Sequence, residues 1–395
     1  MNQLTARLYA CLEIGMVSAY LGLTSFGGPA AHLGYFHNEY VVKRKWISEQ
    51  SYGDLVALCQ FLPGPASSQA GMGIGMMRAG IPGAIAAWLG FTLPSAILLI
   101  LFALLMHGRD MGDSAWIHGL KLTAVAIVAQ AVLMMGQKLA HTKTLATIAV
   151  LTAGTALLWQ SPVSQIVLIA VSGLAGWLRY RDQPAAAEPS PGIKLNRKAG
   201  VLLISLFVLL LIVLPLLRGV VDAHLFDLFD SFYRTGSLVF GGGHVVLPLL
   251  QHEVVQSNWV SQTDFLAGYG AAQAVPGPLF TFASYLGMIS EGLPGAITAT
   301  AAIFLPAFLL IAGALPFWNE LRGRAGIQGI MKGVNAAVVG LLLAALYNPI
   351  WVSAVHAPKD FALAAVLFIM LVVWKVPPWA AAGAGALGGM LLLWI

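Results

Sequence analysis

Charged residues are scarce in this chain. Only 9% of its 395 residues are Asp, Glu, Lys or Arg, whereas soluble proteins carry about 25%. Hydrophobic residues make up 58%, and the stretches 83–106, 200–217 and 327–347 are predominantly apolar. Each is long enough to cross about 30 Å of hydrocarbon. The composition excludes a soluble globular protein and predicts an all-α polytopic membrane protein, because in lipid a helix satisfies its own backbone hydrogen bonds.

Several residue types and motifs that carry chemistry are also missing. The two cysteines, Cys11 and Cys59, lie in apolar segments, which excludes a disulfide framework and a thiolate metal site. The sequence contains no GxxxxGKS/T loop, no HExxH and no GxSxG. We therefore expect no catalytic residues, no metal site, no cofactor and no nucleotide-driven pump. The net charge of +5 comes from short loops rather than a basic patch, so nucleic acid is not an expected partner.

The sequence repeats itself after 212 to 214 residues. The matched features keep their order and spacing; they include Phe26-Gly27-Gly28 with Phe240-Gly241-Gly242, Glu39 with Glu253, Trp46 with Trp259, Pro63-Gly64-Pro65 with Pro276-Gly277-Pro278, and Pro94 with Pro306. A charged, Pro/Ala-rich stretch at 179–198 has the composition of a linker. The sequence predicts an N-terminal repeat over 1–178, a cytoplasmic linker with a joining transmembrane helix over 179–221, and a C-terminal repeat over 222–395.

The distribution of Lys and Arg indicates that the two repeats are inverted. The loop after the first glycine pair carries Lys43, Arg44 and Lys45, whereas the equivalent loop at 251–264 carries neither residue type. Because short cytoplasmic loops concentrate Lys and Arg, equivalent loops should face opposite sides of the membrane. An odd number of spans between the repeats produces this inversion. The expected spans are 83–106, 116–138, 144–159, 162–178, 200–217, 294–316, 327–347, 361–375 and 379–395.

Four elements near the starts of the halves interrupt apolar segments. Two are glycine breaks, GGP at 27–29 and GGGH at 241–244, and two are PGP turns, within LPGPASSQ at 62–69 and VPGPLFTF at 275–282. Irregular backbone at membrane depth is tolerated where it is buried in protein or lines a cavity. A helix that begins there presents free N–H groups and the positive end of its dipole, both of which suit an anion.

A single Gly-Gly pair more often marks close helix packing and a single Pro a kink, but duplication in register favours one central anion site. Its expected lining is Gly27, Gly28, Pro29, Gln60, Pro63, Gly64, Pro65, Ser67 and Ser68 in the first half, and Gly241, Gly242, Gly243, His244, Gln273, Pro276, Gly277, Pro278 and Thr281 in the second. Glu39 and Glu253, at matching positions, are expected either to couple transport to protons or to cap helices. The other histidines near the breaks, His32, His37 and His252, are expected to make local hydrogen bonds.

These motifs resemble the chromate ion transporter family in its long-chain form, in which two homologous domains are fused. The resemblance rests on SFGGPAAHLGYFHNEYV, RKWISEQ, LPGPASSQAGMGIG and FTLPSA in the first half, and on FGGGHVVLPLL and WVSQTDFLAGYGAAQAVPGPLFTFASYLG in the second. It implies a bacterial or archaeal inner-membrane carrier that expels chromate and so confers resistance. Two departures leave the substrate preference open. Many relatives have an acidic residue and paired glutamines where this chain has 66–69 (ASSQ), and Gly243 stands at the position of Pro29.

The function expected from the sequence is secondary active export of chromate from the cytoplasm across the bacterial inner membrane. Chromate and sulfate are tetrahedral dianions of similar size, and a site made of backbone N–H and hydroxyl groups distinguishes them weakly. The main alternative is therefore a carrier or exchanger of the same fold for sulfate or another oxyanion. A channel and a lipid-active membrane enzyme are further alternatives. The expected partners are chromate and the lipid bilayer, with sulfate and protons as further candidates, and a homodimer is left open.

Overall fold

The computed structural model describes residues 3–25, 28–106, 115–159, 162–181, 197–218, 220–221, 223–240, 246–317 and 325–392. Within these ranges the chain forms helices and no strand, which confirms the all-α prediction. Five helical segments are long and apolar enough to cross a membrane: Ala66–Met106, Ala115–Leu139, Arg197–Leu217, Leu279–Phe317 and Gly326–Ala354. The prediction of a polytopic membrane protein is confirmed as well.

The main helices of the first half recur in the same order in the second half. The first half contains α1 (Gln3–Thr24), α2 (Gly28–Phe36), the π-helix η1 (His37–Lys43), α3 (Glu49–Phe61), α4 (Ala66–Met106), α5 (Ala115–Leu139), α6 (Lys143–Leu158) and α7 (Pro162–Tyr180). After α8 (Arg197–Leu217), the second half contains α9 (His224–Leu238), α10 (Val246–Val254), α11 (Gln262–Ala274), η3 (Leu279–Thr281), α12 (Phe282–Ala314), η4 (Leu315–Phe317), α14 (Ala325–Ala345), η5 (Leu346–Trp351), α15 (Val352–Ala354), α16 (Pro358–Val372) and α17 (Pro378–Leu391). Even local capping is repeated, because the Ser48 and Ser261 hydroxyls accept backbone N–H groups at the starts of α3 and α11.

A tight hairpin forms around each PGP turn. α4 bends at Gly80 (φ 70°, ψ −155°) and α12 bends at Gly292 (φ 63°, ψ −153°), a conformation that glycine adopts most readily. The bend in α4 lies close to the start of the first hairpin. Arg78 comes just before the bend and Trp46 just before α3, and the Arg78 guanidinium is 4.1 Å from the centre of the Trp46 ring. In the first half the chain therefore returns close to the start of α3, with the PGP turn at the tip of the hairpin, and re-entrance into the membrane stays a prediction for both halves.

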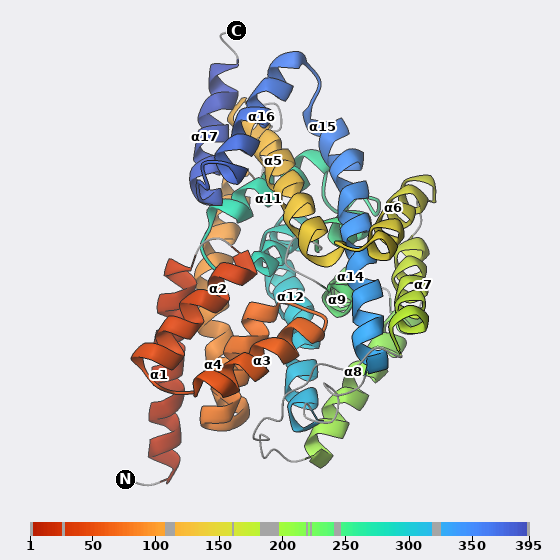
Figure 1. Ribbon diagram of the computed structural model, residues 1–395. Helices are drawn as coiled ribbons and strands as arrows, with labels where there is room; N and C mark the ends of the chain where they lie inside the picture. The colour runs from red at the N-terminus through yellow and green to blue at the C-terminus, as the bar shows by residue number, and fades with distance from the viewer. Residues whose placement is uncertain are drawn as a thin grey trace.

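Equivalent helices of the two halves run in opposite directions. In Figure 1, α4 ends toward the top of the view and α12 ends toward the bottom, and α5 and α14 likewise begin at opposite ends. This arrangement agrees with the inverted repeats expected from the Lys and Arg distribution. The two hairpins consequently approach each other from opposite sides of the molecule.

Three of the expected spans form helices shorter than the hydrocarbon layer. α6, α16 and α17 contain 16, 15 and 14 residues. At 1.5 Å per residue they extend about 24, 23 and 21 Å, against about 30 Å of hydrocarbon. The apolar windows 144–159 and 361–375 have the same lengths as α6 and α16 and differ from them in position by one and three residues, whereas the window 379–395 extends past the end of α17 at Leu391. α8 differs, since only 11% of its apolar window is buried, and it therefore faces lipid along most of its surface.

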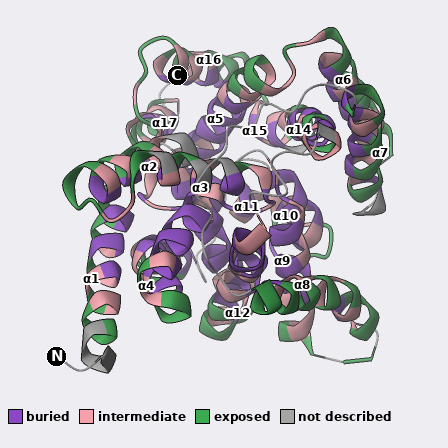
Figure 2. Cartoon of the chain, turned by 60° about the horizontal axis from the view of Figure 1, so that its bottom comes forward, coloured by how far each residue is buried: buried purple, intermediate pink, exposed green. Residues whose placement is uncertain are grey.

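The C-terminal helices are exchanged between the halves. α5 packs against α16 and α17 of the second half, and α14 packs against α6 and α7 of the first. Both crossings depend on small residues: a side chain at Gly119 would collide with the Gly385 carbonyl, and one at Gly333 with the Ser172 carbonyl. Because Gly119 and Gly333 are equivalent positions, the two crossings are copies of each other. Figure 2 shows buried residues gathered on the inner helices, including α5 and α9 to α11, while α8 is exposed at the edge.

Candidate functional site

The tip of each hairpin contacts the glycine break of the other half. The Gly64 N–H donates to the Val239 carbonyl at 2.7 Å, and the Gly277 N–H donates to the Ser25 carbonyl at 3.0 Å. Ser25 and Val239 each directly precede a Phe-Gly-Gly sequence, so the two hydrogen bonds join equivalent residues. Both glycines have positive φ angles, 113° and 103°, which L side chains rarely adopt. The described parts of the four interrupting elements therefore meet at the interface between the halves.

Some expected lining residues lie outside the part of the chain that the structure describes. These are Gly27, Gly241, Gly242, Gly243 and His244. Gly28 and Pro29 begin α2, and Pro63, Pro65, Pro276 and Pro278 frame the two crossing glycines. The glycine-break positions and the prolines remain a predicted lining.

A buried polar cluster occupies the first half of this interface. The starts of α2 and α4 lie together, and the His32 Nδ1 atom is 3.3 Å from the Ser67 Oγ atom. The exposed fractions of these two residues are 1% and 2%. The His32 ring also contacts the Phe91 ring edge to face, with centroids 5.4 Å apart. His32 makes the local hydrogen bond expected of it, and its partner is one of the hydroxyls expected to line the site.

Several polar atoms of this cluster have no hydrogen-bond partner among the described residues. They are Ser25 Oγ, Ser68 Oγ, Gln69 Oε1 and Thr92 Oγ1. The Gln69 amide nitrogen donates to the Pro63 carbonyl at 2.8 Å, which ties α4 to the tip of its own hairpin. A buried polar group without a partner costs about 1–3 kcal/mol. Ser68 directly follows Ser67 and Thr92 directly follows Phe91, both of which contact His32, so these unpaired hydroxyls are groups to which a ligand with acceptor oxygens can bind.

The second half carries no comparable cluster at the matching positions. The equivalents of Ser25, His32, Ser67, Ser68, Gln69, Thr92 and Ser95 are Val239, Val246, Phe280, Thr281, Phe282, Phe304 and Ala307. Only Thr281 keeps a hydroxyl, and that hydroxyl donates to the Pro278 carbonyl at 2.7 Å. The expectation that Thr281 offers a free donor is therefore corrected, because the PGP turn uses its proton. The unpaired hydroxyl groups of the candidate site belong to the first half.

The two glutamines before the PGP turns also depart from expectation. Gln60 is exposed on α3, whereas Leu58 and Cys59 beside it are buried. Successive side chains turn by about 100° around a helix, and this phase directs Gln60 away from the interface. Gln273 is half-buried and hydrogen-bonded to the Tyr269 side chain, while its amide nitrogen has no partner in the described structure. We correct the assignment of Gln60 and retain Gln273 as a proposal.

The two matched glutamates are held by cations. The Glu39 carboxylate accepts from Arg44 Nε at 2.7 Å and from Lys43 Nζ at 3.1 Å. Burial opposes ionisation of Glu39, but these hydrogen bonds outweigh it and lower the pKa of Glu39 below its usual range. Glu253 accepts two hydrogen bonds from Arg234, at 2.9 and 3.0 Å. Proton coupling through either glutamate would require its ion pair to separate.

The sequence contains a signal for the residues that the motif search missed. Ser25, Gln69 and Thr92 lie in apolar segments, where a hydroxyl or amide is common and by itself uninformative. When the two halves are compared position by position, these three residues stand out from other polar residues, because their equivalents, Val239, Phe282 and Phe304, are apolar. A polar residue whose repeat equivalent is apolar is a candidate for function.

Comparison with known proteins covers both halves. A family model described as chromate transporter matches residues 12–177 and 226–390. The chromate transport protein of Cupriavidus metallidurans is 28% identical over 396 residues, which cover 97% of this chain and 94% of the relative. The chromate transport protein of Pseudomonas aeruginosa is 28% identical over 357 residues, covering 86% and 80%. The uncharacterized transporter YwrB of Bacillus subtilis is 36% identical over 118 residues, 29% of this chain and 60% of YwrB.

No solved structure matches the chain. Because one family model matches each half in turn, the chain belongs to the chromate transporter family.

Proposed function

We propose that this protein is a secondary active transporter that carries chromate-like tetrahedral oxyanions across the bacterial inner membrane. Family membership supports the substrate class. The observation that carries the proposal is the set of unpaired, buried hydroxyls of Ser25, Ser68 and Thr92 beside the starts of α2 and α4. Such a site offers hydrogen-bond donors and the positive ends of helix dipoles to an anion.

The binding chemistry suits transport because it is strong but reversible. A hydrogen bond to a charged group contributes about 1.5–3 kcal/mol, so a few hydroxyl donors hold a dianion without a neighbouring Lys or Arg. An ion pair buried at membrane depth would release its anion less readily. We infer that Ser67, Ser68 and His32 orient the anion, and that backbone N–H groups at the helix starts supply the remaining donors.

Alternating access would rearrange the two hydrogen-bonded crossings at the centre. The Gly64–Val239 and Gly277–Ser25 hydrogen bonds join the halves at equivalent points, so movement of one half against the other strains both contacts. Inverted repeats commonly move in this way around a fixed midplane site. We propose export of chromate from the cytoplasm, and resistance to chromate as its consequence.

A sulfate carrier or exchanger of the same fold is the second candidate. The described polar cluster consists of neutral hydroxyl, amide and imidazole groups, which bind by shape and charge. Chromate and sulfate present four oxygens in the same geometry, and such a site separates them weakly. Competition by sulfate is therefore expected whichever anion is the physiological substrate.

Uptake of labelled chromate into inside-out membrane vesicles tests the proposal. Uptake should saturate with chromate concentration and should fall when sulfate is added. An imposed pH gradient then separates proton coupling, which the gradient would drive, from anion exchange, which needs a counter-anion inside the vesicles. Vesicles that contain inserted protein yet take up no more chromate than empty ones would reject chromate export, and labelled sulfate would then decide the second candidate.

A further inference from the structure

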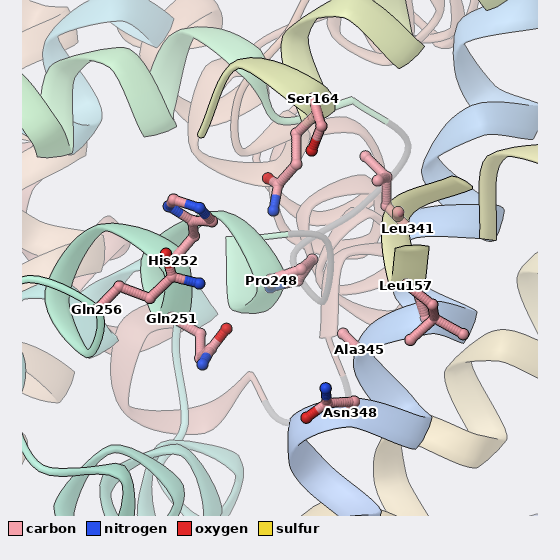
Figure 3. A pocket seen from close by; sticks show the side chains of 12 residues that line it. Leu157, Ser164, Pro248, Gln251, His252, Gln256, Leu341, Ala345 and Asn348 are labelled. Carbon is pink, nitrogen blue, oxygen red and sulfur yellow. The ribbon is translucent and has the colours of Figure 1, made fainter. Parts of the chain in front are cut away.

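A polar cavity lies away from the central cluster, between α10 of the second half, α6 and α7 of the first, and the end of α14 with η5. Its volume is about 150 Å³, and a single water molecule needs only about 10–15 Å³ of such space. Figure 3 shows Gln251, His252 and Gln256 on one wall, with Ser164 and Asn348 on others. The cavity therefore has room for an oxyanion with part of its hydration shell.

The lining offers donors and no carboxylate. Its polar side chains are amides of Gln165, Gln251, Gln256 and Asn348, the Ser164 hydroxyl and the His252 imidazole. Amide oxygens can also coordinate a cation, but no carboxylate stands among these lining residues to balance its charge. The amide, hydroxyl and imidazole groups can all donate to an anion with several acceptor oxygens.

His252 gives the cavity a group that points to a ligand. The exposed fraction of His252 is 9%, and its Nε2 atom has no hydrogen-bond partner in the described structure. An unpaired ring nitrogen at a polar cavity wall requires a partner. In the first half the equivalent residue is Asn38, which is exposed on η1.

A smaller chamber continues from this cavity toward the centre of the molecule. Gln165 and His252 line both spaces, and Arg234, Glu253 and Leu238 line the smaller one. Leu238 directly precedes Val239, whose carbonyl accepts the Gly64 N–H at the central crossing. Arg234 pairs with Asp230 and Glu253, and Arg218 lies within 4.0 Å of the same two carboxyl groups, so two guanidinium groups face two carboxyl groups here. The smaller chamber thus lies one residue along the chain from the central crossing.

We propose that this cavity is a second oxyanion site of the transporter, in which His252, Gln165, Gln251 and Asn348 hold the anion on its route to or from the central cluster. The proposal rests on the function proposed above. It assigns the cavity the same substrate class, a tetrahedral dianion, and a role in loading rather than in the movement of the halves. The walls come from both halves, so their movement would also open or close this site.

A carboxylate placed in the cavity tests the proposal directly. Gln251→Glu keeps the length of the side chain. The Gln251 amide nitrogen donates to the Gln262 side-chain oxygen at 3.4 Å, and in the variant the Gln262 amide can reorient to donate to the new carboxylate. Like charge disfavours a dianion, so the half-saturation concentration for labelled chromate in vesicles should rise about tenfold or more, with the maximal rate within about twofold. His252→Ala should raise the half-saturation concentration to a smaller extent.

Asn38→Glu is the matched control, because Asn38 is the repeat equivalent of His252 and is exposed. It should leave the half-saturation concentration unchanged. A Gln251→Glu protein that is stably inserted and binds chromate like the wild type would overturn the second site, and so would a loss of maximal rate alone. Equilibrium binding of labelled sulfate to the purified protein separates the two proposals. If the wild-type protein binds sulfate, Gln251→Glu abolishes that binding and no transport is seen in vesicles, the second site would be supported and the proposed transport rejected.

Discussion

Ser68 is the residue whose replacement most directly tests the central cluster. Its hydroxyl is buried and has no partner among the described residues, so Ser68→Ala should leave the thermal stability of the protein unchanged or slightly raised. If the hydroxyl donates to the anion, its loss removes about 1.5–3 kcal/mol of binding, equivalent to about a 10- to 100-fold weaker affinity. Competition binding with sulfate and the half-saturation concentration for chromate measure this effect.

Thr281→Ala provides the control, because Thr281 occupies the matching position of the second half. Its hydroxyl caps the PGP turn by donating to the Pro278 carbonyl. Loss of that hydrogen bond should lower stability by about 1 kcal/mol and leave the affinity for the anion unchanged. Equal losses of affinity in Ser68→Ala and Thr281→Ala would contradict a cluster confined to the first half.

At the same residue scale, the sequence predicts which positions break the helices but not where each side chain points. Pro63, Gly64 and Gly277 were identified because glycine and proline interrupt helices, and irregular backbone at membrane depth is tolerated only where it is buried in protein or lines a cavity. The assignments of Gln60 and Thr281 failed for local reasons: Gln60 follows the exposed face of α3, and Thr281 turns back onto its own chain. Side-chain direction depends on helix phase and capping, which motif spacing does not encode.

At the scale of elements, the hairpins depend on contacts at their tips. Gly277 has a φ of 103°, and a Cβ there would lie 2.8 Å from Ser95 Oγ on α4. Gly292, at the bend of α12, has a φ of 63° with no atom within 4 Å of such a Cβ among the described residues. Alanine at either position adds about 1–2 kcal/mol of backbone strain. Gly277→Ala should therefore lower stability and transport more than Gly292→Ala.

The double variant Gly277→Ala with Ser95→Gly distinguishes collision from backbone strain. Removal of the Ser95 side chain relieves the collision, so part of the lost transport should return even though glycine costs about 1 kcal/mol within a helix. Thermal unfolding and vesicle uptake of the single and double variants complete the cycle. Equal damage from Gly277→Ala and Gly292→Ala, without recovery in the double variant, would mean that the tip contact has no special role.

The elements also show how far hydropathy predicts this fold. The long spans and the interrupted segments were located from apolar windows and Gly/Pro signals, and the structure has helices at these places. The predicted lengths of α6 and α16 agree with the helices, and only the window 379–395 extends beyond its helix, because its apolar residues continue past the end of α17 at Leu391. Which helix packs on which is set by matched small residues such as Gly119 and Gly385, and no window reveals that pairing.

For the whole molecule, the exchange of helices makes each half complete the other. α5 depends on α16 and α17, and α14 depends on α6 and α7. His118 of α5 and Asp360 of α16 add a contact of 2.8 Å between the halves. The central hydrogen bonds cross between the halves in the same reciprocal way. The 118 residues matched in YwrB are 60% of that protein, so chains about half as long as this one occur among its relatives.

A chain divided between residues 190 and 191, inside the predicted linker, should therefore work as two pieces. Either piece alone exposes apolar helix faces and should fail to accumulate or transport, because exposed small-residue crossings have no partner. The two pieces expressed together should copurify and restore chromate uptake to within a few-fold of the intact chain. Gly385→Leu in the second piece blocks the crossing with Gly119 and should prevent copurification, which makes it the matched control. If the first piece alone transports chromate, two copies of it must form the central crossing without the second half, and the polar cluster would then be present twice rather than once.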